Sequence, residues 1–183
     1  MEFGYKAVST RQVAKQCSIS QPTLYYHFAD KQELYVAVLL EALHHMTRDL
    51  AKFAGMPGRT LEEKLSGLAT SIMQHTSRDL NVRAMLQDIE SQLDEAARLK
   101  VSEAFFRSMI LPIINILQEG CPDPAHPPGG LSVVALAFLF LNMISTMTER
   151  GIQQDRRKLE PPETIEERAV KLTRFFLHGF LHS

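Results

Sequence analysis

Apolar side chains recur along this chain at intervals of three and four residues, the spacing that lines one face of an α-helix. The stretch from Asp30 to Phe53 shows the pattern most fully. Its apolar stripe consists of Tyr35, Leu39, Ala42, Met46, Leu50 and Phe53. No stretch alternates apolar and polar residues for long enough to form a half-buried strand, and no internal repeat is visible. The pattern therefore predicts an all-α protein.

Capping residues predict where these helices begin. Side chains that can accept a free backbone N–H stand at the starts of the expected helices, at Ser9, Ser20, Asp30, Thr60, Asp79, Asp94 and Thr164. Ser9 with Gln12 and Thr164 with Glu167 also have the spacing of a capping box, in which the two residues satisfy each other's backbone N–H groups.

Glycine and proline predict where the helices end. The segments 55–58 and 120–130 are rich in both residues and are expected to be loops. Pro112 should kink or divide a long helix over residues 94–119, because proline lacks the N–H that the helix needs. We expect a polar loop over residues 151–163.

One segment is apolar enough to raise the question of a membrane. Leu131 to Met147 is seventeen residues without a charge, whereas a membrane span usually needs about 20 apolar residues. Asn142 and several hydroxyl side chains also interrupt it. A helix buried on most sides is the better interpretation, and we expect no membrane partner.

The first compact unit has the spacing of a helix-turn-helix. A short helix after Ser9 and a second after Ser20 are joined by the turn Ser18-Ile19-Ser20. The second helix of such a motif enters the DNA major groove. On spacing alone, a helical hairpin within an ordinary bundle is the alternative.

The residues around this turn suit contact with DNA. Gln21 and Thr23 can hydrogen-bond to base edges, while Pro22 and the tyrosine rings can contact thymine methyl groups. Polar or charged side chains that can reach phosphate oxygens are Thr10, Arg11, Tyr25, Tyr26, His27 and Lys31.

The residues of this unit also resemble a known family. The runs Ser9-Thr10-Arg11-Gln12-Val13-Ala14, Ile19 to Phe28 and Lys31-Gln32-Glu33-Leu34 are similar to the DNA-binding domain of tetracycline-repressor-type (TetR family) regulators. The resemblance implies an all-helical homodimer with an N-terminal helix-turn-helix DNA-binding domain joined to a larger helical ligand-binding and dimerisation domain. It assigns residues 1–36 to the first and 37–183 to the second. The DNA contacts it implies are Thr10, Arg11, Gln21, Pro22, Thr23, Tyr25, Tyr26, His27 and Lys31.

Two features depart from the family pattern. Ser18 occupies a turn position where glycine is common, and a left-handed backbone there costs a non-glycine residue about 1 kcal/mol. The family also has a helix before the pair that is here Gly4-Tyr5. We therefore expect most of that helix to be missing, Val8, Val13 and Leu24 to be incompletely covered, and operator binding by this chain to be weak.

The rest of the chain is interpreted from pattern and from the resemblance. Helices near residues 131–150 and 164–181 have more outward apolar residues than a monomer surface favours, and we expect them to form a four-helix dimer interface. For residues 131–150, a central core helix is the alternative. Candidate residues for an apolar ligand pocket, which are otherwise core, are Met73, Met85, Phe105, Phe106, Met109, Phe138 and Met143.

Charge and composition refine this picture. The 183 residues carry a net charge of −1, but residues 1–31 carry +2 and the remainder −3, so a slightly basic head joins an acidic body. Cys17 and Cys121 are too few for a disulfide framework or a four-ligand zinc site, which favours a reducing cytoplasm. Phosphate-binding loops and hydrolase or metalloprotease motifs are absent, so we expect neither an enzyme, a cofactor nor a metal site.

The sequence thus predicts a ligand-responsive DNA-binding regulator, a repressor released from a palindromic operator by an apolar small molecule. Two alternatives remain at this point. One is a helical interaction module with impaired DNA binding, and the other is a helical-bundle enzyme, which would need polar groups converging in the apolar middle of the chain.

Overall fold

A computed structural model of the chain describes residues 5–6, 8–54, 57–78, 82–120, 130–157 and 163–181. Its helices are α1 (Thr10–Gln16), α2 (Gln21–His27), α3 (Lys31–Ala54), α4 (Leu61–Arg78), α5 (Val82–Gln92), α6 (Glu95–Phe105), the π-helical segment η1 (Phe106–Ile110), α7 (Leu111–Gly120), α8 (Val133–Arg157) and α9 (Ile165–Leu181). No strand occurs among these residues, so the all-α prediction is confirmed.

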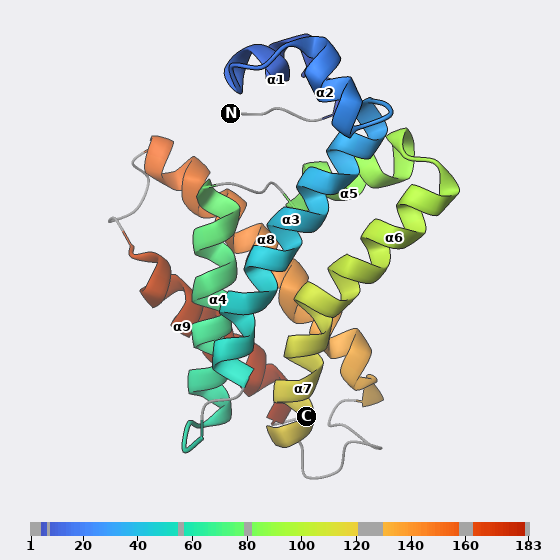
Figure 1. Cartoon of the computed structure of the whole chain (residues 1–183). Coiled ribbons are helices and arrows are strands. Elements are labelled where there is room, and N and C mark those ends of the chain that lie inside the picture. Colours follow the sequence, from blue (N-terminus) through green and yellow to red (C-terminus); the bar gives the residue numbers. More distant parts are fainter. Residues whose placement is uncertain are drawn as a thin grey trace.

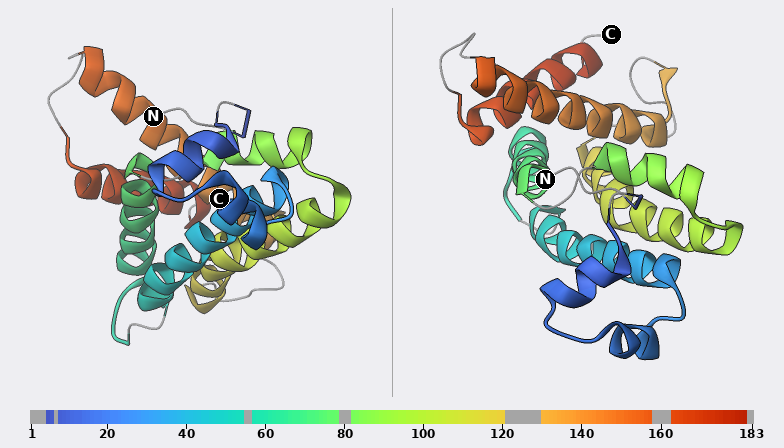
Figure 2. Two further views of the ribbon diagram at one scale, coloured as in Figure 1. Left: turned by 45° about the horizontal axis from the view of Figure 1, so that its top comes forward. Right: turned by 90° about the horizontal axis from the view of Figure 1, so that it is seen from above.

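The helices form a small head on a larger body (Figure 1). The head consists of α1, α2 and the start of α3, and α3 then runs down into the body. In the body, α4 packs against α3, α7, α8 and α9, while α3 also contacts α6, η1 and α7. Figure 2 shows α8 and α9 together on the side of the body opposite α3. The expected boundary between residues 36 and 37 falls inside α3, so the head and the body share one continuous helix.

The core lies where α3, α4, η1, α7 and α8 meet. Its fully buried side chains include Leu43, Leu50, Leu65, Leu68, Ile72, Met109, Ile113, Ile116 and Phe140. On α3, Leu39, Met46 and Leu50 of the predicted stripe are buried, but so are Val36 and Leu43 outside it. The buried face of α3 is wider than predicted because the helix has neighbours on two sides.

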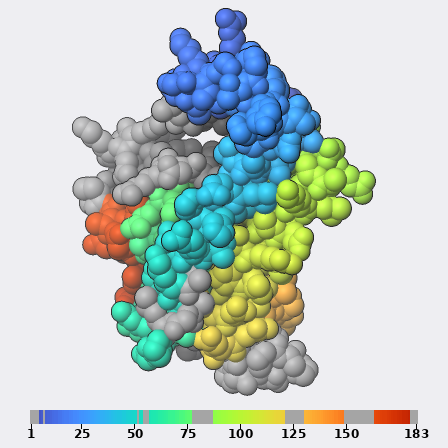
Figure 3. Space-filling view, in the orientation of Figure 1, coloured from blue at the N-terminus to red at the C-terminus, as the bar shows by residue number. Residues whose placement is uncertain are grey.

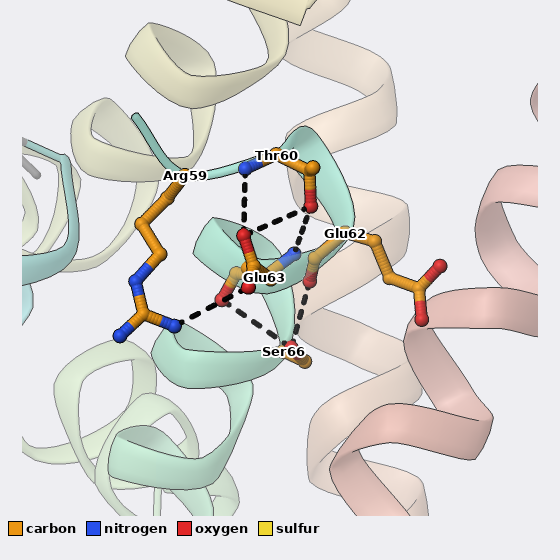
Figure 4. Close-up of polar contacts among 5 residues, drawn as sticks. All are labelled: Arg59, Thr60, Glu62, Glu63 and Ser66. Carbon is orange, nitrogen blue, oxygen red and sulfur yellow. Dashed lines mark hydrogen bonds and ion pairs between the residues drawn. The ribbon is translucent and has the colours of Figure 1, made fainter. Parts of the chain in front are cut away.

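The two predicted capping boxes form reciprocal hydrogen bonds, while the predicted cap Asp79 lies outside the described residues. At α1, the Gln12 backbone N–H donates to Ser9 Oγ (3.2 Å) and the Ser9 N–H donates to Gln12 Oε1 (2.8 Å). Thr164 and Glu167 make the same exchange at α9. At α4, Glu63 accepts from the Thr60 backbone N–H at 2.8 Å (Figure 4). That bond is the largest of the effects that lower the pKa of Glu63.

Pro112 divides the long helix, but through a π-helical segment that precedes it. Because Pro112 has no N–H, the carbonyl of Ser108 has no α-helical donor four residues later. The Leu111 N–H instead donates to the carbonyl of Phe106, five residues back. The sequence predicted an interruption of this helix at Pro112. In the structure the interruption is the five-residue π-helical segment Phe106–Ile110, which lies between α6 and α7.

The prediction of a loop over residues 151–163 is wrong for its first seven residues. Helix α8 continues to Arg157. A single glycine costs a helix only about 1 kcal/mol relative to alanine, and the glutamines and arginines that follow Gly151 are good helix formers. Among the described residues, no helix is both long enough and apolar enough to cross a bilayer.

Candidate nucleic-acid interface

The turn between α1 and α2 is closed by backbone hydrogen bonds typical of a Schellman motif. The Ile19 N–H donates to the Ala14 carbonyl (3.0 Å), and the Ser18 N–H donates to the Lys15 carbonyl (3.2 Å). Ser18 sits at the left-handed position with φ 55°, as its place in the pattern predicted. Beneath the turn, Ala14 and Leu24 are buried and join the two helices.

Helix α2 presents an exposed surface that combines aromatic rings with hydrogen-bonding groups. Ser20 caps the helix by accepting the Thr23 backbone N–H at 3.1 Å, with Pro22 in the first turn as predicted. The exposed side chains of this surface are Gln21, Pro22, Thr23, Tyr25, Tyr26 and His27. Tyr26 is 86% exposed, and its ring meets His27 edge-on. Figure 3 shows the head that carries this surface at one end of the molecule, next to the start of α3.

The residues expected to flank α2 differ in their surroundings. Arg11 is exposed on α1 and free to meet a phosphate. Lys31 is half-buried, with Nζ 4.4 Å from the centre of the Tyr5 ring. Thr10 is buried, with Oγ1 3.0 Å from Tyr25 Oη and accepting from Gln21 Nε2 at 3.3 Å. The structure therefore joins Thr10 to α2 itself.

A contact that the sequence did not reveal joins the head to the body at Asp88 of α5. Asp88 Oδ2 accepts from the Tyr5 backbone N–H and from the Tyr35 hydroxyl, each at 2.8 Å. The Tyr5 and Tyr35 rings pack edge to face, with centroids 5.1 Å apart. Burial, followed by the hydrogen bond to Asp88 and its charge, raises the pKa of Tyr35 well above its ordinary value.

A second contact lies beside it, between α3 and the start of α6. Gln32 Nε2 donates to Asp94 Oδ2 at 2.6 Å, and the Asp94 backbone N–H donates to Gln32 Oε1 at 2.9 Å. We call Tyr5, Gln32, Tyr35, Asp88 and Asp94 the head–body junction. Movement of α5 or of the start of α6 would act on the head through these bonds.

An apolar hollow of about 200 Å³ lies between α1 and α3. Val8, Val13, Leu34 and Val38 are among the residues that line it. Val8 and Val13 are thus only partly covered, whereas Leu24 is 3% exposed and belongs to the buried centre of the head.

The candidate ligand residues do not form one cluster. Met73, Phe105 and Met109 are buried in the core of the body. Phe106 and Phe138 are 38% and 41% exposed on the surface of the chain. Met143 lines an open groove of about 550 Å³ between α8 and α9, and the side chain of Met85 lies outside the described residues. In the described part of the chain, no three His, Cys, Asp or Glu side chains gather as metal ligands would.

The α8–α9 side of the body carries exposed apolar side chains. They are Leu131, just before α8, then Val134, Phe138 and Leu139 on α8, and Phe175 on α9. Phe175, at 75% exposed, borders the same groove as Met143. An apolar surface of this kind is typical of a protein–protein contact.

The head, its capped second helix and the shared long helix have the arrangement of a helix-turn-helix, the motif whose second helix enters the DNA major groove. Residues 1–38 match the family model for bacterial regulatory proteins of the tetR family. The chain is also 25% identical, over 128 residues, to the HTH-type transcriptional regulator UidR of Escherichia coli (strain K12). That match covers 62% of this chain and 64% of UidR, slightly less than two thirds of the relative.

Solved structures share the fold over nearly the whole chain. The TetR family regulator PfmR of Thermus thermophilus superposes with a TM-score of 0.67 at 22% identity, covering 95% of this chain and 90% of PfmR. FadR of Bacillus subtilis, solved in complex with stearoyl-CoA, superposes with a TM-score of 0.72 at 16% identity, covering 96% and 90%. Over residues 1–38 the chain thus resembles bacterial regulatory proteins of the tetR family, and over nearly its whole length it shares the fold of these solved structures.

Proposed function

We propose that the protein is a ligand-responsive repressor that binds a palindromic operator as a homodimer. The observation that carries the proposal is the exposed surface of α2, which a Schellman turn and the Ser20 cap hold in a fixed conformation. Gln21 and Thr23 would read base edges from the major groove. Arg11 would contact a phosphate and so set the position of the head.

The exposed apolar side of α8 and α9 supports the dimer. Two helices from each protomer would bury Phe138, Phe175 and their neighbours around a two-fold axis. The axis would place two copies of α2 about 34–36 Å apart, in successive turns of the major groove.

We infer that an apolar effector binds in the interior of the body. Met73, Phe105 and Met109 offer adaptable apolar contacts there, and the like-folded FadR was solved with stearoyl-CoA. Binding near these side chains would displace α5 or α6, and the head–body junction would carry that displacement to the heads. The proposal gives the chain no catalytic step and places it in the cytoplasm with the DNA.

The salt dependence of DNA binding tests the proposal. Binding of the 183-residue chain to a pool of random-sequence duplexes of about 40 base pairs would be measured by fluorescence anisotropy over a range of salt concentrations. Arg11→Ala should reduce the slope of log K against log salt by about one unit, because one phosphate contact is lost. Lys100→Ala, which removes a charge from the exposed side of α6, should leave the slope unchanged. Equal slopes for the two variants, or no binding by the wild type, would contradict the proposal.

A further inference from the structure

A three-residue hydrogen-bond network joins the first turn of α1 to α2. Thr10 Oγ1 lies 3.0 Å from Tyr25 Oη and accepts from Gln21 Nε2 at 3.3 Å. Thr10 is 8% exposed, whereas Gln21 and Tyr25 are exposed on the surface that would meet DNA. A buried residue of one helix thus holds two exposed side chains of the other.

The chemistry of the three groups limits what Thr10 can do. An amide nitrogen only donates, so the Thr10 oxygen must accept from Gln21. The single hydroxyl proton of Thr10 then donates to Tyr25, or the remaining lone pair accepts from Tyr25. In either arrangement the Thr10 oxygen has two partners within the head, and at 8% exposed the residue offers little surface to an approaching phosphate.

The network also fixes how Gln21 faces outward. With Nε2 bound to Thr10, the carboxamide keeps its oxygen and its second N–H for a partner. Adenine presents an N6 donor and an N7 acceptor in the major groove, the pair that such a carboxamide matches. Holding the side chain in place before DNA arrives also reduces the conformational entropy lost on binding.

We propose that Thr10 is a positioning residue for base recognition, holding Gln21 and Tyr25 for readout instead of contacting a phosphate. The inference rests on the proposed function, because it requires α2 to enter the major groove. It assigns Thr10 a different role from the phosphate contact that its place beside α2 in the sequence predicted. It also predicts that Thr10 and Gln21 control the preference at the same base pair.

The test compares Thr10→Val, Thr10→Ser and Gln21→Ala with the wild type. A preferred duplex would first be selected with the wild-type chain from the random duplex pool. Dissociation constants would then be measured for that duplex and for every single-base substitution in one half-site. Thr10→Val keeps the shape of the side chain and removes the hydroxyl, while Thr10→Ser keeps the hydroxyl.

We expect Thr10→Val to discriminate about tenfold less than the wild type between the selected base pair and its substitutions. The loss should occur at the same base pair at which Gln21→Ala loses discrimination. The affinity of Thr10→Val for random duplexes and its salt slope should stay at the wild-type values, and Thr10→Ser should restore the discrimination. A uniform loss of affinity with a salt slope smaller by about one unit would overturn the inference in favour of a phosphate contact. Unchanged discrimination in Thr10→Val, or failure of Thr10→Ser to restore it, would also overturn it.

Two controls keep the result decisive. If circular dichroism shows that Thr10→Val is unfolded, Tyr25→Phe is used in place of Thr10→Val. Tyr25→Phe removes the hydrogen bond between Thr10 and the exposed Tyr25 ring. It should weaken discrimination at the same base pair, and an unchanged preference would overturn the inference. If the wild type enriches no sequence from the pool, the proposed function fails and the inference fails with it. If the wild type enriches a sequence and Thr10→Val shows the same base preference on it, the proposed role of Thr10 is wrong while the proposed function stands.

Discussion

Ser18 holds the turn of the helix-turn-helix in a left-handed conformation that favours glycine. Its φ of 55° is the only positive φ of a non-glycine residue in the described part of the chain. The conformation costs an L-residue roughly 1–2 kcal/mol, and the Schellman hydrogen bonds of Ser18 and Ile19 maintain it. The turn is therefore a point where local strain is balanced by the packing of the head.

Replacing Ser18 with glycine should stabilise the head. We expect Ser18→Gly to raise the free energy of unfolding by up to about 1 kcal/mol, because relief of the strain outweighs the added freedom of the unfolded chain. Urea denaturation followed by circular dichroism measures the change. Gln16→Gly, at the helical end of α1, is the control and should destabilise by about 1 kcal/mol. Destabilisation in both variants would contradict the argument.

Local residue patterns predicted the head well because its structure depends on short-range contacts. The Ser9–Gln12 box, the Ser20 cap and the left-handed Ser18 all involve short stretches of neighbouring residues. The role of Thr10 was not predictable in the same way. Its partners Gln21 and Tyr25 lie 11 and 15 positions away, and only the crossing of α1 and α2 brings them together.

At the scale of elements, the hydrogen bonds of Asp88 could not be predicted from the sequence either, because their partners are also distant along the chain. Asp88 lies 53 positions from Tyr35 and 83 from Tyr5, and no local pattern indicates such a pairing. The predicted stripe of α3 did place Tyr35 on its inner face, but not its partner. The sequence analysis did not predict that α8 extends to Arg157. It interpreted the polar residues after Gly151 as a loop, although most of them have a high helix propensity.

Removing the carboxylate of Asp88 should loosen the head without unfolding the body. In Asp88→Ala, the Tyr5 amide loses its acceptor and Tyr35 loses its hydrogen bond. Hydrogen exchange at the Tyr5 amide should therefore become at least about tenfold faster, while exchange in α4 and α7 stays unchanged. The matched control is Glu90→Ala, which removes an exposed carboxylate from the same helix. Equal exchange at Tyr5 in both variants would show that Asp88 does not restrain the head.

The pH dependence of stability tests the Tyr35 contact separately. Because folding raises the pKa of Tyr35, the contact stabilises fully below the unfolded tyrosine value of about 10 and is lost as pH rises toward the folded value. The stability advantage of the wild type over Tyr35→Phe should thus be constant from about pH 7 to 9 and shrink at about pH 11. Urea denaturation at each pH measures it, with Tyr26→Phe on the exposed face of α2 as the control. An advantage that grows with pH would contradict the assigned cause.

For the whole molecule, we propose that the apolar side of α8 and α9 forms the dimer interface. Burying one phenylalanine contributes about 1.5–3 kcal/mol, and a two-fold axis repeats each contact. Phe175→Glu should therefore weaken dimerisation at least about 100-fold and yield a 20.7 kDa species in sedimentation equilibrium. Leu99→Glu, which changes an exposed apolar residue on α6, should remain dimeric. A dimeric Phe175→Glu would place the interface elsewhere.

The central claim is that two copies of α2 read DNA together. Hydroxyl-radical footprinting of the 183-residue chain on its selected duplex tests it most directly. The account predicts two protected segments related by inverted symmetry, with centres about 10–10.5 base pairs apart or a multiple of that spacing. A single protected segment without symmetry, or no protection at concentrations that saturate binding, would contradict it.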